Sequence, residues 1–251
     1  MVVPVLGHDA VLAAVSPGAA IEHVRDAFAA HHAGAWTMPS KVYLQAPPAG
    51  DFRAMPALGG GFAMLKWISS FPGNPAAHGL PTVMGIVCLS DAGTSEPRML
   101  LDARAVTALR TGAVAAVAAD ALSRDGATSV GVIGCGLHGA WAARCLAAAG
   151  YGPGKAEATI EAIERCALFC DEWAQASHGG ELTGAVEAGV VAREQVTDLG
   201  AVLAGAAPGR AGADGVTLFD STGLAIQDLA IAIAAHAAWS AGRVEAQQLT
   251  L

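Results

Sequence analysis

The stretch TSVGVIGCGLHGAWAARC, residues 128–145, decides the fold of the second half of this chain. Its β-branched run at 129–133 predicts a strand, the glycines at 134–139 have the spacing G-x-G-x-x-G, and the Ala-rich segment 140–149 predicts a helix. Strand, glycine turn and helix in this order are typical of the first unit of a dinucleotide-binding domain. In that unit the N–H groups and the dipole of the helix N-terminus face a pyrophosphate. The alternative is a tight strand-to-helix turn without a ligand.

The composition is that of a core-rich globular protein. Of 251 residues, 53% are hydrophobic and 14% are charged, which suits one large domain or two modest ones. The net charge of −8 and the lack of a long basic cluster argue against a nucleic-acid partner. No uninterrupted apolar run has membrane-spanning length, and the N-terminus has no signal-peptide pattern. We therefore expect a cytoplasmic protein that binds neither a membrane nor nucleic acid.

The five cysteines lie in apolar contexts and are odd in number, so we expect buried thiols in a reducing compartment. Cys166 and Cys170 are four positions apart, but no further Cys or His pair lies nearby. A zinc site needs four such ligands, so we expect no metal site.

The segment before the glycine turn predicts a separate α+β unit with an antiparallel or mixed sheet. The expected elements are a helix at 21–31, strands at 42–44, 63–69, 82–90 and 99–101, and a helix at 105–122. After the turn, the sequence predicts strands at 167–170 and 216–219 and helices at 159–164, 194–203 and 224–239. The fold class is therefore α/β: an N-terminal α+β domain joined to a Rossmann-like domain with a parallel sheet.

Several motifs occur in a fixed order along the chain: Met38-Pro39-x-Lys41, the segments 51–56, 72–75 and 79–84, Lys66-Trp67, Thr107-Ala-Leu-Arg-Thr-Gly-Ala113, and Phe219-Asp-Ser-Thr-Gly-Leu-Ala-Ile-Gln-Asp228. The series resembles the ornithine cyclodeaminase/μ-crystallin family, most closely its alanine-dehydrogenase and imine-reductase branch. The resemblance covers residues 20–240, and the pair of strings 110–113 and 220–223 is its most specific part.

The resemblance implies a two-domain subunit. Residues 1–115 with 224–251 would form the dimerisation and substrate domain, and residues 116–223 the Rossmann-like domain. It also implies hydride transfer between NAD or NADP and the amine-bearing carbon of a small amino acid, or the corresponding imine. The expected partners are a small amino or keto acid and a second copy of the chain. The sheet between residues 42 and 101 is apolar enough to require such a partner surface.

The resemblance also assigns site residues. Arg110 offers a bidentate fork for the substrate carboxylate, and Lys41 borders the substrate. Lys66 is the expected catalytic residue, because its ammonium could polarise a carbonyl or imine, or exchange a proton if burial lowers its pKa. The positions that match cofactor contacts are Thr82, Thr111, Gly134, Gly136, Leu137, His138, Lys155 and Ser221.

Each of these residues also has a structural interpretation without a ligand. Lys41 would then be a solvated surface lysine, and Lys66 an amphipathic side chain that reaches solvent from an apolar strand. Arg110 would form a structural ion pair with Asp102 or Asp120.

The dinucleotide-binding region is short. Gly134 and Ser221 are 87 positions apart, whereas a complete doubly wound domain needs about 150 residues. The segment 152–157 looks like a family segment that follows the fifth strand, so Glu157 is not the ribose-binding acid. The strand that carries that acid is then absent. The same match places Tyr151 where the family has its catalytic aspartate, and a phenol is a poor base at neutral pH.

Three interpretations stay open at this point. The chain is an NAD(P)-linked enzyme whose cofactor binding is weak or absent, or an amino-acid-binding dimer or cofactor-independent isomerase or lyase, or an internally deleted chain without function. His138 is interpreted as an exposed residue at the helix start, and Asp228 as a structural hydrogen-bond or capping group rather than a catalytic one.

Overall fold

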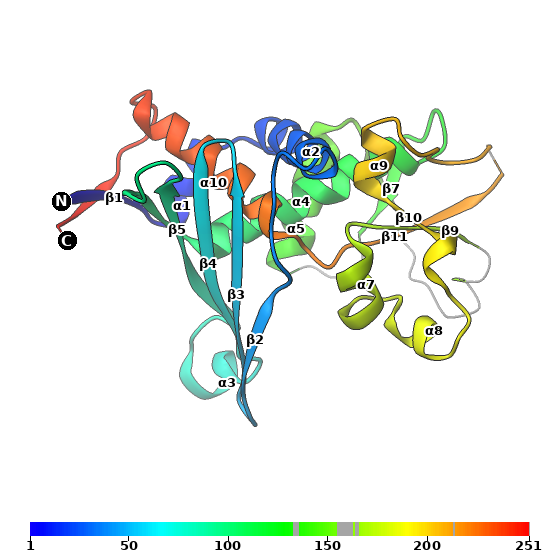
Figure 1. Cartoon of the computed structure of the whole chain (residues 1–251), viewed down its shortest axis with the longest axis horizontal. Helices are drawn as coiled ribbons and strands as arrows, with labels where there is room; N and C mark the ends of the chain where they lie inside the picture. Colours follow the sequence, from blue (N-terminus) through cyan, green and yellow to red (C-terminus); the bar gives the residue numbers. More distant parts are fainter. Residues whose placement is uncertain (133–135, 155–162, 164–165, 213, 251) are drawn as a thin grey trace.

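The computed structural model describes residues 1–132, 136–154, 163, 166–212 and 214–250. The chain has two parts (Figure 1). The larger part, residues 1–122 and 225–250, is a seven-stranded sheet covered by helices on one face. The smaller part, from 129 to 220, carries two short parallel sheets. The α/β fold class predicted from the sequence is confirmed. Gly134 and Lys155, two of the expected cofactor contacts, lie outside the described residues.

The seven-stranded sheet is mixed. Only β1 and β6 pair in parallel, and the other neighbours pair antiparallel. The order is β12-β1-β6-β5-β4-β3-β2, so the first and last strands of the chain lie side by side. The strands are β1 (Val2–Leu6), β2 (Val42–Ala46), β3 (Gly50–Gly59), β4 (Phe62–Ser70), β5 (Val83–Asp91), β6 (Pro97–Asp102) and β12 (Gln247–Thr250).

Four helices build the core on one face of this sheet: α1 (His8–Ala14), α2 (Pro17–His32), α4 (Ala103–Leu122) and α10 (Ala225–Ser240). Ser16 is the N-cap of α2 and accepts a hydrogen bond from the Ala19 backbone N–H. Asp102 is the N-cap of α4 and accepts one from the Ala105 backbone N–H. The helix α4 has the length and hydropathy of a membrane-spanning segment. However, 72% of its most apolar window is buried inside the protein, as expected of a central core helix. The short helix α3 (Asn74–His78) lies between β4 and β5.

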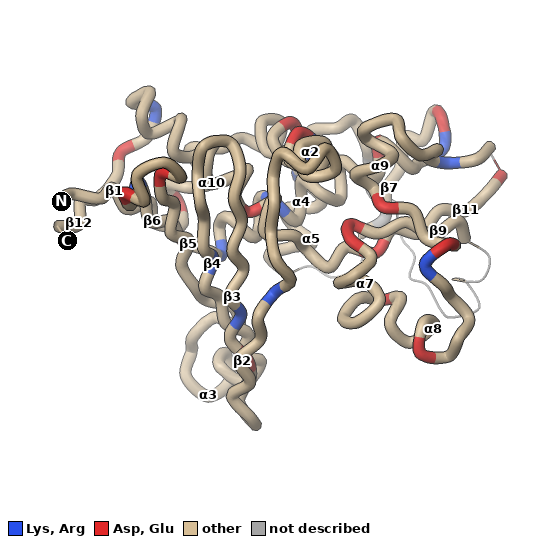
Figure 2. The backbone as a smooth tube through the Cα atoms, in the orientation of Figure 1, with Lys and Arg blue, Asp and Glu red and all other residues tan. Residues whose placement is uncertain are grey.

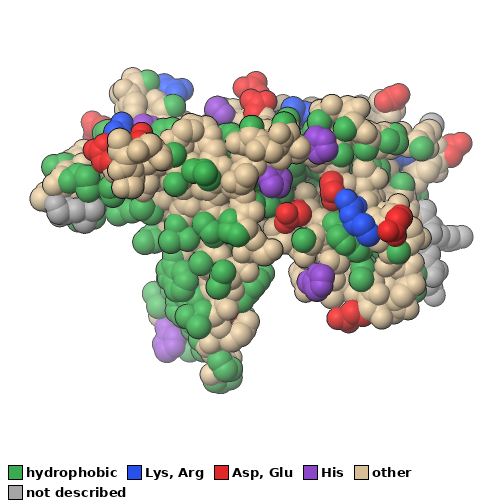
Figure 3. All heavy atoms as spheres, in the orientation of Figure 1, with side chains coloured by type: hydrophobic (Ala, Val, Ile, Leu, Met, Phe, Trp, Pro, Cys, Tyr) green, Lys and Arg blue, Asp and Glu red, His purple; other side chains and the backbone are tan. Residues whose placement is uncertain are grey.

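The other face of the sheet is apolar and exposed. Strand alternation buries Met64 and Ile68 against the helices, while Leu65, Trp67 and Ile86 point outward and are 43%, 38% and 54% exposed. Figure 3 shows hydrophobic side chains gathered over the part of the molecule that projects downward in this view, where β2, β3 and β4 lie. An apolar sheet face of this kind is typical of a surface that meets a partner.

The smaller part contains β9 (Cys166–Cys170) between β10 (Val196–Asp198) and β11 (Val216–Asp220), all parallel, and a separate pair of β7 (Ser129–Gly131) and β8 (Gly152–Gly154). The three strands expected here therefore do not share one sheet among the described residues. The helix predicted at 194–203 is confirmed only in its second half, α9 (Leu199–Leu203). Its first half is wrong, because β-branched Val196 and Thr197 form β10 after the short 3-10 helix η1 (Arg193–Gln195). The helices α7 (Trp173–Gly179) and α8 (Thr183–Glu187) follow β9, and most of the helix expected at 159–164 lies outside the described residues.

The helix α5 (Leu137–Ala148), which follows the glycine turn, packs on α4 and joins the two parts. The contact is close because Gly112 has no side chain: a Cβ there would lie 2.5 Å from the carbonyl oxygen of Trp141. Cys145 of α5 packs at the same point, and burial raises the pKa of its thiol to about 11. This contact fixes where the N-terminus of α5 lies relative to the large sheet.

Candidate active site

A buried ionic cluster lies between β4, α4 and α10. Lys66 Nζ donates a hydrogen bond to Asp228 Oδ1 at 2.8 Å, and Arg110 Nε lies 3.2 Å from the same oxygen. The Lys66 and Asp228 side chains are only 1% and 0% exposed, and that of Arg110 is 11% exposed. A buried charge is stable only with a partner, and Asp228 is that partner for both Lys66 and Arg110. The alternative interpretation of Arg110, an ion pair with Asp102 or Asp120, is wrong, because Asp102 pairs with His8 and Asp120 with Arg25.

The fold brings this cluster together from three distant segments. Strand alternation turns Lys66 inward with Met64 and Ile68, Arg110 projects from the middle of α4, and Asp228 lies in the first turn of α10. Burial lowers the pKa of Lys66, Asp228 opposes this shift and the nearby charge of Arg110 adds to it, so that the pKa is about 8. Lys66 is therefore an amine that can gain and lose a proton close to neutral pH.

The turn after β11 holds the cluster from a second side. Asp171, buried at the end of β9, accepts hydrogen bonds from Thr222 Oγ1 at 2.9 Å and from the Gly223 backbone N–H at 2.7 Å. Gly223 has φ +80°, and a Cβ at that position would collide with the Arg110 guanidinium. Lys41 Nζ donates to the Thr222 carbonyl oxygen at 2.6 Å. The turn thereby connects Lys41 and Arg110 to the end of the small parallel sheet.

A small cavity of about 100 Å³ opens in front of the cluster, and we call it the central chamber. Its wall contains Lys41, Arg53, Lys66 and Arg110 from the larger part of the chain, and His138 and Thr222 from the smaller part. In Figure 2, basic positions lie on β3, on β4 and on the chain that enters β2. The structure thus places the three residues predicted to bind substrate, Lys41, Lys66 and Arg110, around one chamber.

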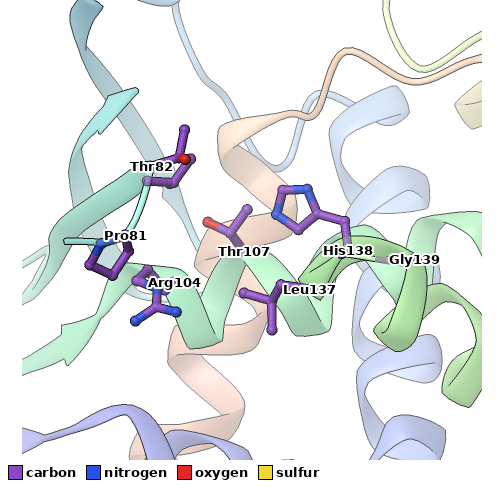
Figure 4. A pocket seen from close by; sticks show the side chains of 9 residues that line it. Pro81, Thr82, Arg104, Thr107, Leu137, His138 and Gly139 are labelled. Carbon is purple, nitrogen blue, oxygen red and sulfur yellow. The ribbon is translucent and has the colours of Figure 1, made fainter. Parts of the chain in front are cut away.

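A second cavity of about 470 Å³ lies beside the N-terminus of α5, and we call it the glycine-turn cavity. Thr82, Gly136, Leu137 and His138, all expected cofactor contacts, line it, and it shares His138 and Thr107 with the central chamber. Figure 4 shows the ring of His138 pointing toward Thr107 across the cavity. Partial burial and the positive charges of Arg110 and Lys66 lower the pKa of His138. This residue is exposed at the helix start, as expected, but it also stands where the two cavities meet.

Three other sequence-predicted residues do not line these cavities. Thr111 has its hydroxyl buried without a hydrogen-bond partner among the described residues. Ser221 is exposed, and its hydroxyl lies 3.5 Å from Asp171. Tyr151 donates to or accepts from Ser123 at 3.0 Å, beyond the C-terminal end of α4. Because Ser123 follows Arg110 by 13 helical positions, Tyr151 lies roughly 20 Å from the chamber and cannot replace a catalytic base there.

Sequence reasoning missed Arg53, Thr107, Asp171 and Thr222, and it interpreted Asp228 as structural. Arg53 and Thr107 lie inside motifs that were recognised as strings, but no local pattern shows which of their side chains face a cavity. Asp171 follows the buried strand β9, and a carboxylate at the carboxyl end of a parallel strand is the signal that could have identified it. Among the described residues, no group of three or more His, Cys, Asp or Glu side chains could hold a metal ion.

Comparison with known proteins gives this arrangement a family. Residues 5–149 and 138–243 match the Ornithine cyclodeaminase/mu-crystallin family in two segments that overlap across α5. An alanine dehydrogenase of Archaeoglobus fulgidus is 33% identical over 91% of this chain and 92% of its own length. That match extends over 299 aligned positions, more than the 251 residues here, so part of the relative has no counterpart in this chain.

Solved structures agree with the sequence match. An archaeal alanine dehydrogenase dimer with bound NAD superposes with a TM-score of 0.92 at 30% identity, and all of both chains is covered. The iminosuccinate reductase of Paracoccus denitrificans in complex with NAD⁺ has a TM-score of 0.88 at 24% identity, again over all of both chains, and shows the shared fold. The chain, with its buried cluster beside a glycine turn, belongs to the ornithine cyclodeaminase/mu-crystallin family.

Proposed function

We propose that this protein is an NAD(P)-linked oxidoreductase that acts on the amine-bearing carbon of a small amino acid or its imine. The observation that carries the proposal is the central chamber, where Lys66, Arg110 and Asp228 meet next to the glycine-turn cavity. The relatives include an alanine dehydrogenase of Archaeoglobus fulgidus and an N-((2S)-2-amino-2-carboxyethyl)-L-glutamate dehydrogenase of Staphylococcus aureus. Both names describe redox chemistry at such a carbon.

The described part of the glycine-turn cavity fits a dinucleotide. Gly136 precedes α5 without a side-chain cap, so the free N–H groups of the first helical turn are available to a phosphate. Thr82 lines the glycine-turn cavity, and His138 lines both this cavity and the central chamber, so a nicotinamide ring would be held where the two spaces meet. A bound NAD or NADP would supply or accept the hydride.

The chain's own residues bind the substrate and move its proton. Arg110 offers its guanidinium to the substrate carboxylate, which orients the amine-bearing carbon in the chamber. Lys66 exchanges a proton with the substrate nitrogen or oxygen, and its lowered pKa places this exchange near neutral pH. Asp228 keeps Lys66 fixed and balances the charges of Lys66 and Arg110 when the chamber holds no substrate.

We further propose that residues 1–115 with 224–251 act as the substrate and dimerisation domain and residues 116–223 as the cofactor domain, and that two copies meet through the exposed sheet face around Trp67. The neighbour with bound NAD is a dimer, and the exposed apolar residues form the kind of patch that a partner covers. Sedimentation at micromolar concentration should give a dimer. Trp67→Glu should give monomers, because it places a charge in the proposed interface.

Cofactor binding is expected to be weak, because the sequence lacks the acidic strand that would hold the adenosine ribose. Loss of those hydrogen bonds should weaken binding by roughly 1.5–3 kcal/mol, so a micromolar site becomes tens of micromolar or weaker. The test is a titration of tryptophan fluorescence with NADH and NADPH, followed by an assay for amino-acid-dependent NADH formation. Binding of a small amino acid with no turnover at millimolar cofactor would favour the amino-acid-binding dimer instead.

A further inference from the structure

A third cavity opens on the far side of the central chamber from the glycine turn. It has a volume of about 540 Å³ and lies between the start of β2, β3 and the helix α7, and we call it the side cavity. The side cavity shares Lys41, Arg53 and Thr222 with the central chamber. The glycine-turn cavity shares Thr107 and His138 with the central chamber. The three cavities therefore lie in series, with the small chamber in the middle.

The cavity volumes indicate that the reacting end of a substrate lies in the central chamber and that its side chain lies in the side cavity. The central chamber, at about 100 Å³, is much smaller than the two cavities beside it, at about 470 and 540 Å³, which suits the reacting end of the substrate, an α-carbon with its amine and carboxylate. The glycine-turn cavity is taken by the cofactor under the proposed function. Any longer side chain of the substrate must then enter the side cavity, past Lys41 and Arg53.

The side cavity is built for an acidic group. Its wall carries Lys41, Arg53, Gln175 and His178, and none of its described lining residues is acidic. Arg53 is held in place by two hydrogen bonds to Asp51, at 2.6 and 3.1 Å. Lys41 is half-buried and donates to the Thr222 carbonyl, and among the described residues no carboxylate lies within 4 Å of its ammonium. A cation in this position gains most from an anionic ligand.

The charges around the chamber lead to the same ligand. Four cations and three carboxylates gather there: Lys41, Arg53, Lys66 and Arg110 with Asp51, Asp171 and Asp228. Asp51 pairs with Arg53, Asp171 accepts from Thr222 and Gly223, and Asp228 pairs with Lys66. Among the described residues, Lys41 therefore has no carboxylate within 4 Å. A second carboxylate on the substrate side chain would neutralise it.

We propose that the substrate is an amino or imino dicarboxylic acid whose second carboxylate enters the side cavity and pairs with Lys41. This inference rests on the proposed function, because it takes the reacting carbon to lie beside Lys66. It adds the class of substrate, which neither the family nor the cluster itself decides.

The test compares L-aspartate with L-asparagine by calorimetry, without cofactor. The two ligands have nearly the same shape and differ in the charge of the side chain. We expect aspartate to bind at least tenfold more tightly, Lys41→Gln to abolish this preference, and Lys41→Arg to keep it. Circular dichroism of each variant verifies that it is folded. Equal affinities in the wild type, or a preference that survives Lys41→Gln, would overturn the inference.

A second experiment separates this inference from the proposed function. Ammonia-dependent oxidation of NADH is measured with oxaloacetate and with 2-oxobutyrate, which has the same chain length without the second acid. Faster turnover of oxaloacetate supports both statements. Turnover of 2-oxobutyrate alone overturns the dicarboxylate proposal and leaves the oxidoreductase intact. A binding preference for aspartate without turnover of either acid supports the side cavity and overturns the redox function.

Discussion

Asp228→Asn is the sharpest perturbation of the buried cluster, because it removes one charge and keeps the volume of the side chain. At 2.8 Å, the attraction between Lys66 and Asp228 is about 6 kcal/mol at an effective dielectric constant of about 20. The desolvation of both charges offsets much of this attraction in the wild type. In the variant, buried Arg110 loses its carboxylate partner, and Lys66 loses the group that opposes its deprotonation. We therefore expect a loss of about 3–5 kcal/mol in the free energy of unfolding.

The assay is urea unfolding followed by tryptophan fluorescence at a fixed protein concentration, since dimerisation would contribute to the measured stability. A double-mutant cycle with Lys66→Met isolates the pair. We expect the double variant to be more stable than the sum of the single effects predicts, by at least about 1.5 kcal/mol. A loss below about 1 kcal/mol for Asp228→Asn, or strictly additive effects, would refute the view that this pair is a buried, mutually dependent unit.

Three further perturbations address the site and the joint between the two parts. Gly223→Ala should displace the Arg110 guanidinium and lower amino-acid affinity at least tenfold while the protein stays folded; unchanged affinity in calorimetry would contradict the assigned role of Arg110. The pKa of Lys66 is about 8 in the native state, and its ordinary value in the unfolded chain is 10.5. Between these two pH values the unfolded state therefore binds more protons than the native state. The stability of the wild type relative to Lys66→Met should therefore rise with pH across that window by up to about 1.4 kcal/mol per unit, and a flat difference would show that Lys66 is not desolvated. Gly112→Ala should push α5 off α4 at the Trp141 carbonyl and reduce stability by about 1–3 kcal/mol, and wild-type stability in urea would show that the helices separate easily.

The best-predicted elements are those in which the residues favour the same secondary structure along the whole length of the element. The helices α4 and α10 are nearly uniform in Ala, Val, Leu and Ile, and β4 and β5 are long apolar runs, so each was placed within a few residues. The strand β3 was recognised as a motif without being predicted as a strand, because it contains charged residues and Pro56. The structure tolerates that proline because β2 pairs with β3 only as far as Ala54. Pro56 lies beyond this pairing, so β2 loses no hydrogen bond through the missing N–H of the proline.

The candidate site was predictable only as far as recognisable strings extend. Lys41, Lys66 and Arg110 were selected through motifs, and the structure places them around one chamber, although their roles stay predictions. The partner of Lys66 could not be predicted, because Asp228 lies 162 positions away and no local periodicity links the two. The same holds for Asp171, whose contacts with the turn after β11 exist only once the parallel strands have paired.

The origin of the chamber's walls has a consequence for protein engineering. The charged side chains at its surface come from the chain around β2–β4 and from α4, and Asp228 behind them comes from α10. Among the described lining residues, only His138 and Thr222 come from the segment between 128 and 223. Under the proposed function, the charged groups that hold the amine and carboxylate of the substrate are thus encoded mostly outside the segment between 128 and 223. A module of another origin, spliced in after α4 and rejoined before α10, would keep Lys41, Lys66, Arg110 and Asp228 in place. It would have to supply again the walls that this segment now gives to the pocket: His138, Asp171, Thr222 and the α7 side of the side cavity.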